Sequence, residues 1–214
     1  MIPIAPKEVA MADEIEIVDY DTNWPRLFEE ERALLERALP PDQVLAIEHA
    51  GSTAIPGISA KPIIDIFLAV RSIEAARATL VGPIEAIGYV CWAENPDKER
   101  MFFVKGMPPY GERRTHHIHI MEPSNAAWQC VLAFRDHLRA HPDEAERYQQ
   151  LKRDLASRHR SDREAYTRAK DTYVVAVVEM ARKCLASAMS ERKEASASSL
   201  RTGPSRTGSR TTGS

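Results

Sequence analysis

The chain has 214 residues, of which 43% are hydrophobic and 28% are charged. This length suits one domain of ordinary size, with or without an appendage, and the composition is typical of folded, water-soluble proteins rather than highly charged disordered ones. The formal net charge is only −2, which excludes an overall field strong enough to draw the protein onto nucleic acid or anionic lipid.

The sequence shows no pattern typical of a membrane span, a secretion signal, a disulfide framework or a cysteine-based zinc site. No apolar run approaches the roughly 20 residues that cross a bilayer, and the N-terminus lacks the basic and apolar regions of a secretion signal. Cys91, Cys130 and Cys184 lie far apart and form no CxxC pair, which argues against a disulfide framework or a zinc knuckle. We therefore expect a cytoplasmic protein without a membrane partner and without an extended nucleic-acid surface.

The chain is expected to begin with strands around one helix. Residues 15–18 alternate like a short strand, and Asn23 with Pro25 just inside marks the start of a helix. Residues 44–48 are the next strand candidate, and the glycines and prolines of 51–62 predict a loop.

The middle of the chain predicts a sheet. Residues 63–70 form a continuous apolar run rich in strand formers, which indicates a central strand covered on both faces, with Asp65 as the anomaly in it. The segments that follow predict a helix over 73–87 and strands over 89–92, 101–105 and 115–121.

Apolar residues at helical spacing predict three packed helices in the C-terminal part. The second begins near Pro142, and Ser161 with Glu164 resembles a capping box at the start of the third. From Ser187 the apolar periodicity stops, and the composition predicts a disordered tail. We therefore expect a leader over 1–14, a folded α/β (α+β) domain over 15–186 with a C-terminal helical segment, and a tail over 187–214.

The first candidate for chemistry is the corner Gly51-Ser52-Thr53, which directly follows a predicted strand. Backbone amides and hydroxyls at such a corner can approach a phosphate, because glycine has no side chain in the way. A tight turn in which Ser52 or Thr53 caps the next segment explains the same residues.

Asp65 is the second candidate. An ionised carboxylate inside an apolar strand is costly unless it meets a metal, a cation or several donors. Lys61, at the mouth of the same strand, would either neutralise Asp65 as a structural pair or hold the phosphate of a bound nucleotide.

A cluster of histidines in the strand 115–121 is the third candidate. Side chains alternate along a strand, so His117 and His119 point to one face and His116 to the other. The same-face pair is a potential metal clamp that Asp65 would complete, and hydrogen-bonded packing is the alternative.

Arginines offer candidate anion contacts. Arg114 stands with Arg113 at the entrance to the histidine strand and could hold a triphosphate or an acidic substrate, although a solvated turn explains it equally well. Arg135 lies on a predicted helix, where it either contacts an anion or pairs with an acidic neighbour at the surface.

The run EHAGSTAIPG at 48–57, followed by KPIIDI at 61–66, resembles the signature of the GrpB family. The resemblance extends over about residues 15–183 and includes the later pieces HIH at 117–119, FRD at 134–136 and HP at 141–142. That family looks like a branch of the DNA polymerase beta-type nucleotidyltransferase superfamily, and it also occurs fused behind dephospho-coenzyme A kinase. The resemblance implies a mixed central sheet flanked by helices.

The resemblance also implies roles for individual residues. Gly51 and Ser52 would hold nucleotide phosphates, and Asp65 would be the first metal-binding carboxylate, while Thr53 and Lys61 belong to the family signature. The chain departs from the active superfamily pattern at Phe67, where a second carboxylate is expected. This departure puts catalysis in doubt, because two-metal phosphoryl transfer relies on paired ions.

We therefore form a leading hypothesis of metal-dependent transfer of a nucleotidyl group from a nucleoside triphosphate to a small-molecule acceptor, with Mg²⁺ or Mn²⁺ as cofactor. A catalytically inactive nucleotide- or coenzyme-binding module and a metal-dependent hydrolase are the alternatives. The expected catalytic residues are Asp65 and Lys61, the phosphate-binding residues Gly51, Ser52, Thr53, Lys61, Arg114 and Arg135, and the metal ligands Asp65, His117, His119 and Glu48.

Overall fold

A five-stranded mixed sheet forms the centre of the computed structural model, which describes residues 14–201 and the side chains of residues 14–162 and 164–183. The strands lie in the order β1-β2-β5-β4-β3, with β2 and β5 parallel and the other neighbours antiparallel. The expected mixed sheet is therefore confirmed. Its strands are β1 (Val44–Ala50), β2 (Ile64–Val70), β3 (Tyr89–Cys91), β4 (Arg100–Lys105) and β5 (His116–Met121).

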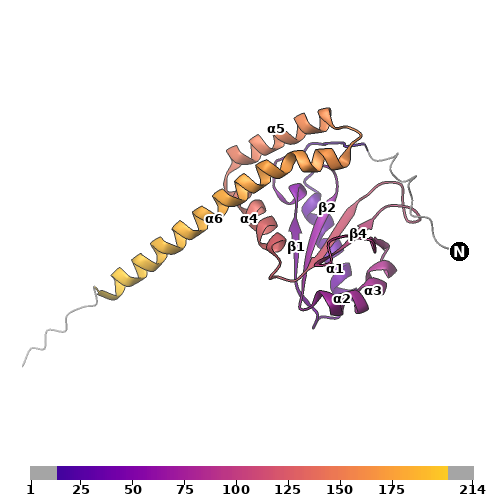
Figure 1. Ribbon diagram of the computed structural model, residues 1–214, viewed down its shortest axis with the longest axis horizontal. Helices are drawn as coiled ribbons and strands as arrows, with labels where there is room; N and C mark the ends of the chain where they lie inside the picture. The colour runs from indigo at the N-terminus through magenta and orange to yellow at the C-terminus, as the bar shows by residue number, and fades with distance from the viewer. Residues whose placement is uncertain (1–13, 202–214) are drawn as a thin grey trace, which may run out of the picture.

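Helices cover both faces of the sheet (Figure 1). One face packs against α1 (Trp24–Ala38), α2 (Ile73–Thr79) and α3 (Val81–Ala86). The other lies beneath α4 (Ala126–Ala140), α5 (Pro142–Arg158) and α6 (Arg163–Arg201), and one turn of 3₁₀ helix, η2 (Ser52–Ala54), follows β1. The described helices contain no stretch that is both long enough and apolar enough to cross a bilayer.

Strand β2 is apolar on both faces, as the continuous run predicts. Ile64, Ile66 and Leu68 are fully buried in the core shared with α1, α2 and α3. Phe67 and Ala69 alternate with them and pack in a second core, together with Trp128 of α4. Asp65 alone interrupts this pattern, on the face that α4, α5 and α6 cover.

The strand predicted over residues 15–18 does not form. Only Val18 pairs, in an isolated antiparallel bridge to Ala60 with both hydrogen bonds 2.9 Å long. The next pairing position along this ladder falls on Pro62, which has no N–H to donate, so one of the two ladder hydrogen bonds at that position is lost. Ile15 instead packs beneath α5 and α6 with Leu155 and Tyr166.

The single helix predicted over 73–87 is two helices, α2 and α3, joined at Leu80. Pro83 lies in the first turn of α3 and cannot donate to the carbonyl four residues earlier, which belongs to the last residue of α2. The two short helices keep the same apolar side toward the sheet, because Ala76, Leu80 and Ile84 are all fully buried.

The last helix also differs from expectation at both ends. Asp162 caps it, accepting a hydrogen bond of 2.9 Å from the amide of Ala165, in place of the predicted Ser161. Helix α6 then continues to Arg201, past Ser187, through a segment rich in Ala, Glu, Lys and Arg, which favour helix (Figure 1). The rest of the predicted tail and residues 1–13 of the leader lie outside the described residues.

Candidate functional site

The parallel pairing of β2 and β5 places acidic and histidine side chains side by side. Asp65 is opposite His117, and Phe67 is opposite His119, in the ladder between the two strands. Residues opposite one another share a face, so His117 and His119 lie on one face, as alternation along the strand predicts, and Asp65 lies on that same face. His116 points to the other face, where its ring lies 3.9 Å from Glu31 of α1.

Asp65, His117 and His119 form one compact cluster. Asp65 Oδ1 lies 3.1 Å from His117 Nδ1 and 4.0 Å from His119 Nε2. Burial raises the pKa of the Asp65 carboxyl, but the hydrogen bond from His117 and the charges around it outweigh burial and lower the pKa to about 2. Asp65 is therefore an ionised acceptor, and His117 Nδ1 carries the hydrogen that it donates.

His119, the third member of the cluster, is a neutral imidazole. Burial lowers its pKa to about 3, against the attraction of Asp65, and its ring stacks on Phe67 at 4.5 Å between centroids. Phe67, at the position where the superfamily resemblance implies a second carboxylate, thus orients one of the imidazoles. A neutral imidazole is the form in which histidine binds metals.

The cluster suits a metal ion in both spacing and chemistry. One ligand atom from each residue lies within 4.8 Å of the others, close to the roughly 3–4 Å that separates ligands held at about 2.1 Å from one ion. Two imidazoles and a carboxylate favour ions such as Zn²⁺, Fe²⁺ or Mn²⁺, whereas Mg²⁺ prefers oxygen ligands. Of the two ions expected from the sequence, this donor set fits Mn²⁺ better.

Two buried ring nitrogens of the cluster lack the hydrogen bonds that usually orient metal-binding histidines. His117 Nε2 and His119 Nδ1 have no hydrogen-bond partner within the described part of the chain. Histidines that bind metals usually donate their other N–H to a carbonyl or carboxylate, which orients the ring. Here aromatic contacts provide the orientation, because Phe102 lies against both rings, at 5.1 Å and 4.9 Å between centroids.

The Gly-Ser-Thr corner packs directly on the cluster. Gly51 has a φ of 67°, and a Cβ at this position would lie 2.3 Å from Asp65 Oδ2. Only glycine allows the backbone to pass so close to the carboxylate. The Thr53 hydroxyl is anchored below the corner, where it donates to the Ile63 carbonyl at 3.3 Å and lies 3.1 Å from His49 Nε2.

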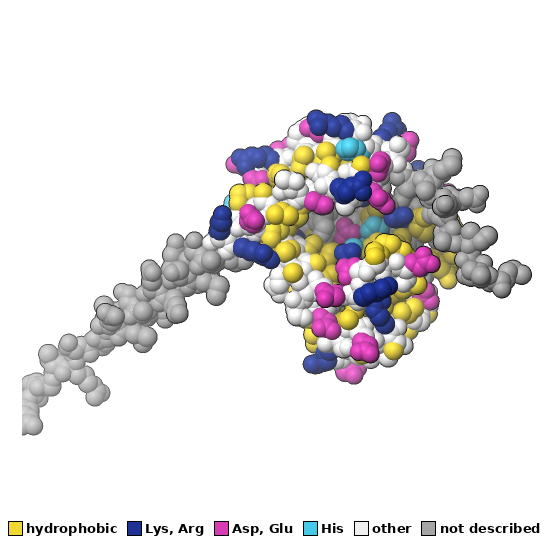
Figure 2. Space-filling model, viewed as in Figure 1, with side chains coloured by type: hydrophobic (Ala, Val, Ile, Leu, Met, Phe, Trp, Pro, Cys, Tyr) yellow, Lys and Arg dark blue, Asp and Glu magenta, His cyan; other side chains and the backbone are white. Residues whose placement is uncertain are grey.

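A cavity of about 510 Å³ opens in front of Asp65, between the sheet and the C-terminal helices. Figure 2 shows a hollow there, in which acidic, basic and histidine side chains gather. The cavity is lined by Gly51, Ser52, Thr53, Lys61, Asp65 and His117 among the expected site residues. His119, the third member of the cluster, is not among the residues that line the cavity.

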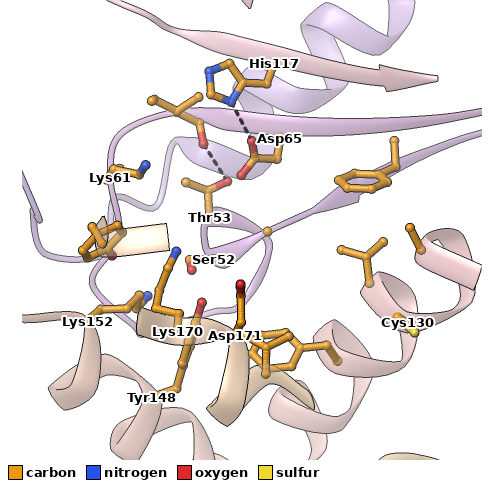
Figure 3. Close-up of a pocket in the computed structure, with 18 of the residues that line it drawn as sticks. Ser52, Thr53, Lys61, Asp65, His117, Cys130, Tyr148, Lys152, Lys170 and Asp171 are labelled. Atoms are coloured by element: carbon orange, nitrogen blue, oxygen red, sulfur yellow. Dashed lines mark hydrogen bonds and ion pairs between the residues drawn. The ribbon is translucent and has the colours of Figure 1, made fainter. Parts of the chain in front are cut away.

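Basic and phenolic side chains from α5 and α6 form the opposite wall. Lys152, Lys170 and Tyr148 extend from these helices toward the Gly-Ser corner, and Lys61 approaches from the loop (Figure 3). Burial raises the pKa of the Tyr148 hydroxyl to about 12, although a hydrogen bond with Ser52 acts in the opposite direction. Tyr148 therefore stays a neutral hydrogen-bonding group in this wall.

The sequence reading missed Lys152 and Lys170. Lys152 is only 1% exposed, and burial lowers the pKa of its ammonium group to about 7, with Lys170 and Arg153 contributing. Its position was visible in the sequence, because Lys152 follows Tyr148 by four residues and precedes Leu155 by three, on the apolar side of the helix. A lysine on a buried face is the signal that could have marked it.

The expected residues Glu48, Arg135 and Arg114 are not brought to this cavity. Arg135 of α4 donates to Glu48 Oε2 at 2.7 Å, to the His49 carbonyl at 2.9 Å and to Asp136 at 2.7 Å. Glu48 and Arg135 line a separate cavity beside α1, and Arg114 lines neither. In this structure Glu48 pairs with Arg135 instead of joining Asp65, His117 and His119, and Arg135 ties α4 to β1.

Comparison with known proteins gives one consistent family. The model of the GrpB protein family matches residues 14–180. A UPF0157 protein of Pseudomonas aeruginosa is 49% identical over 166 residues, which are 78% of this chain and 67% of that protein. The crystal structure of the conserved protein GrpB from Enterococcus faecalis superposes with a TM-score of 0.71 at 34% identity, covering 79% of this chain and 99% of the other.

A further relative has an additional part. A dephospho-CoA kinase of Mycolicibacterium paratuberculosis is 29% identical over 191 residues, which cover 79% of this chain and 46% of the kinase. This chain therefore spans less than half of that protein, as expected of a domain that also occurs joined to dephospho-coenzyme A kinase.

Proposed function

Because the chain belongs to the GrpB family and brings Asp65, His117 and His119, which could hold a metal ion, opposite a basic wall, we propose that it transfers a nucleotidyl group from a nucleoside triphosphate to a small acceptor. The observation that carries the proposal is the placement of Asp65, His117 and Gly51-Ser52 on one side of a cavity and of lysines on the other. A cytoplasmic location fits the proposal, since nucleoside triphosphates are made and used there.

The ion would be held by Asp65, His117 and His119, and it would supply positive charge to the phosphoryl oxygens where negative charge develops. An ion held by His117 would compete with the hydrogen bond that its Nδ1 makes to Asp65. The two histidines would supply the ligands that a second carboxylate provides in the superfamily pattern and that Phe67 cannot.

The remaining groups position the substrate. The backbone at Gly51 and Ser52 and the amine of Lys61 face the cavity, where they would hold phosphate oxygens by hydrogen bonds and charge. An apolar part of the same cavity, lined by Phe67, Val131 and Phe134, would take a base or an acceptor and exclude water.

A catalytically inactive binding module is the second candidate, and Phe67 favours it. With one carboxylate the cluster would hold one ion at most, whereas paired ions stabilise the attacking and leaving oxygens in the two-metal mechanism. Such a module would bind a nucleotide or a coenzyme with the same residues and release it unchanged.

The test combines binding and turnover. Binding of ATP, GTP, CTP and UTP is measured by calorimetry with Mn²⁺, Zn²⁺ or Mg²⁺. Turnover is followed by pyrophosphate and phosphate release, with and without a protein-free bacterial extract as the source of acceptors. Asp65→Asn removes the carboxylate charge, and Asp154→Asn, an exposed position on α5 that does not line the cavity, is the matched control.

Each outcome separates the candidates. Pyrophosphate release that needs the extract, a metal and Asp65 supports the transferase. Release of phosphate alone indicates a metal-dependent hydrolase, and metal-dependent binding without release indicates the binding module. Absence of nucleotide binding under all these conditions would remove the nucleotide site altogether.

A further inference from the structure

Two lysines reach the cavity from helices that lie far along the chain from the Gly-Ser corner. Lys152 of α5 and Lys170 of α6 line the wall across from Asp65, close to Tyr148 (Figure 3). Tyr166 lines the same cavity. Each ammonium group lies over a neighbouring ring, Lys152 at 4.7 Å from the centroid of Tyr148 and Lys170 at 4.4 Å from that of Tyr166. The two rings fix the directions of flexible side chains.

Lys152 is an uncommon residue to bury. A lysine that is 1% exposed loses nearly all of its hydration, and the cost is considerable unless an anion or several acceptors replace the water. It donates to the Ser59 carbonyl, and an ammonium group carries three donors. An anion bound in the cavity would meet the remaining need for acceptors and charge.

The charges that line the cavity favour a highly anionic ligand. The cationic lining residues are Lys61, Arg100, Lys152 and Lys170, against the acidic residues Asp65 and Asp171. A divalent ion at the histidine cluster would add two further positive charges. The excess of positive charge matches the charge of a polyphosphate and is larger than one phosphate group would neutralise.

We propose that Lys152 and Lys170 bind the phosphate groups of the nucleotide that lie farthest from the metal cluster, so that the cavity selects triphosphates over monophosphates. The inference rests on the proposed function, because it takes the nucleotide to occupy this cavity. It adds a polyphosphate subsite formed by α5 and α6. These helices are remote in sequence from the Gly-Ser corner, and only the tertiary fold brings their lysines to it.

A purely structural role for Lys152 is the competing explanation. The loop before β2 is tied to α5 by other bonds as well, since the Ser59 amide donates to Gln149 at 2.5 Å and Arg153 donates to the Ser59 hydroxyl at 3.2 Å. A lysine that only anchors this loop would affect stability and leave the discrimination between phosphate chains unchanged. Lys170 lies on a different helix, α6, so it provides an independent test.

The experiment measures affinity for ATP, ADP, AMP and inorganic tripolyphosphate by calorimetry in the presence of Mn²⁺. Lys152→Met and Lys170→Met keep the length of the side chain and remove its charge. Lys183→Met, an exposed position on α6 outside this cavity, is the control. Melting temperatures without ligand show whether each variant is folded.

We expect each lining variant to bind ATP and tripolyphosphate about tenfold more weakly, because one charge-assisted hydrogen bond is lost. AMP should bind equally to all variants, and Lys183→Met should behave as the wild type. If folded Lys170→Met and Lys152→Met keep the wild-type ratio of ATP to AMP affinity, the subsite is wrong while nucleotide binding stands. If the wild type binds none of these ligands, the subsite and the proposed function both fail.

Discussion

Gly51 lies against the carboxylate of Asp65, so closely that a Cβ on Gly51 would stand 2.3 Å from Asp65 Oδ2. The corner and the acidic residue, 14 positions apart in the chain, therefore form one unit. The contact explains why glycine occupies this position even without any ligand.

Gly51→Ala should destabilise the fold and displace Asp65. Gly57→Ala is the matched control, because Gly57 also has a positive φ, of 82°, but open space around it. We expect about 1–2 kcal/mol of destabilisation for Gly57→Ala from backbone strain alone, and about 1–3 kcal/mol more for Gly51→Ala from the steric overlap. Denaturant unfolding and Mn²⁺ titration measure both effects, and equal behaviour of the two variants would contradict the contact.

The histidine cluster should bind transition metals in preference to Mg²⁺. We expect His117→Ala and His119→Ala to weaken Mn²⁺ or Zn²⁺ binding by at least about tenfold, since each removes a ligand. His116→Ala, in the same strand but on the opposite face, should leave the affinity unchanged. Equilibrium dialysis with metal analysis gives the answer, and a loss in His116→Ala equal to the others would argue against this site.

Lys152 should make stability depend on pH between neutral and alkaline conditions. In the unfolded chain the amine keeps its proton up to an ordinary pKa of 10.5, whereas burial lowers the pKa in the native state to about 7. Between these values the unfolded state binds more protons, so the free energy of unfolding rises with pH. Below about pH 7 both states are protonated and this contribution is constant.

The check is the difference in the free energy of unfolding between wild type and Lys152→Met, measured by urea denaturation from pH 6 to pH 10. The variant also loses the bond to the Ser59 carbonyl, but that loss shifts the difference by a constant. The free energy of unfolding of the wild type should increase relative to that of the variant as the pH rises above about 7. A flat difference would show that the native lysine titrates normally.

Arg135 should act on stability rather than on ligand binding. Its side chain is 10% exposed and holds Glu48 and the His49 carbonyl, so Arg135→Met should cost about 2–3 kcal/mol. Glu48→Gln, which keeps a hydrogen-bonding oxygen at the 37% exposed partner, should cost less. Nucleotide affinity of both folded variants should equal that of wild type, and a tenfold loss in Arg135→Met alone would restore the phosphate role expected from the sequence.

Local patterns predicted most of the elements. Five strands and the helices of the C-terminal part follow from alternation, apolar runs and helical spacing, which act between near neighbours. The predictions failed for two elements whose hydrogen bonding depends on a proline. Residues 15–18 pair only through Val18 and Ala60, since the next partner, Pro62, lacks a donor, and the helix over 73–87 divides because Pro83 cannot complete the bonding of α2.

The sequence by itself determined the residue types of the site and the faces on which they lie. Asp65 in an apolar strand and the pair His117 and His119 in another were identifiable because side-chain alternation is a local property. Only the tertiary structure decided that β2 and β5 are parallel neighbours in register, which brings Asp65 beside His117.

The same distinction separates the residues that reached the cavity from those that did not. Lys152 and Lys170 line it and Arg135 turns away to Glu48, because helix packing chooses the neighbours of a long side chain. Pairing across strands and packing between helices depend on contacts remote in sequence. Residue spacing within one segment does not specify these long-range contacts. The sequence therefore identified candidate residue types, whereas their assembly into one cavity required the tertiary structure.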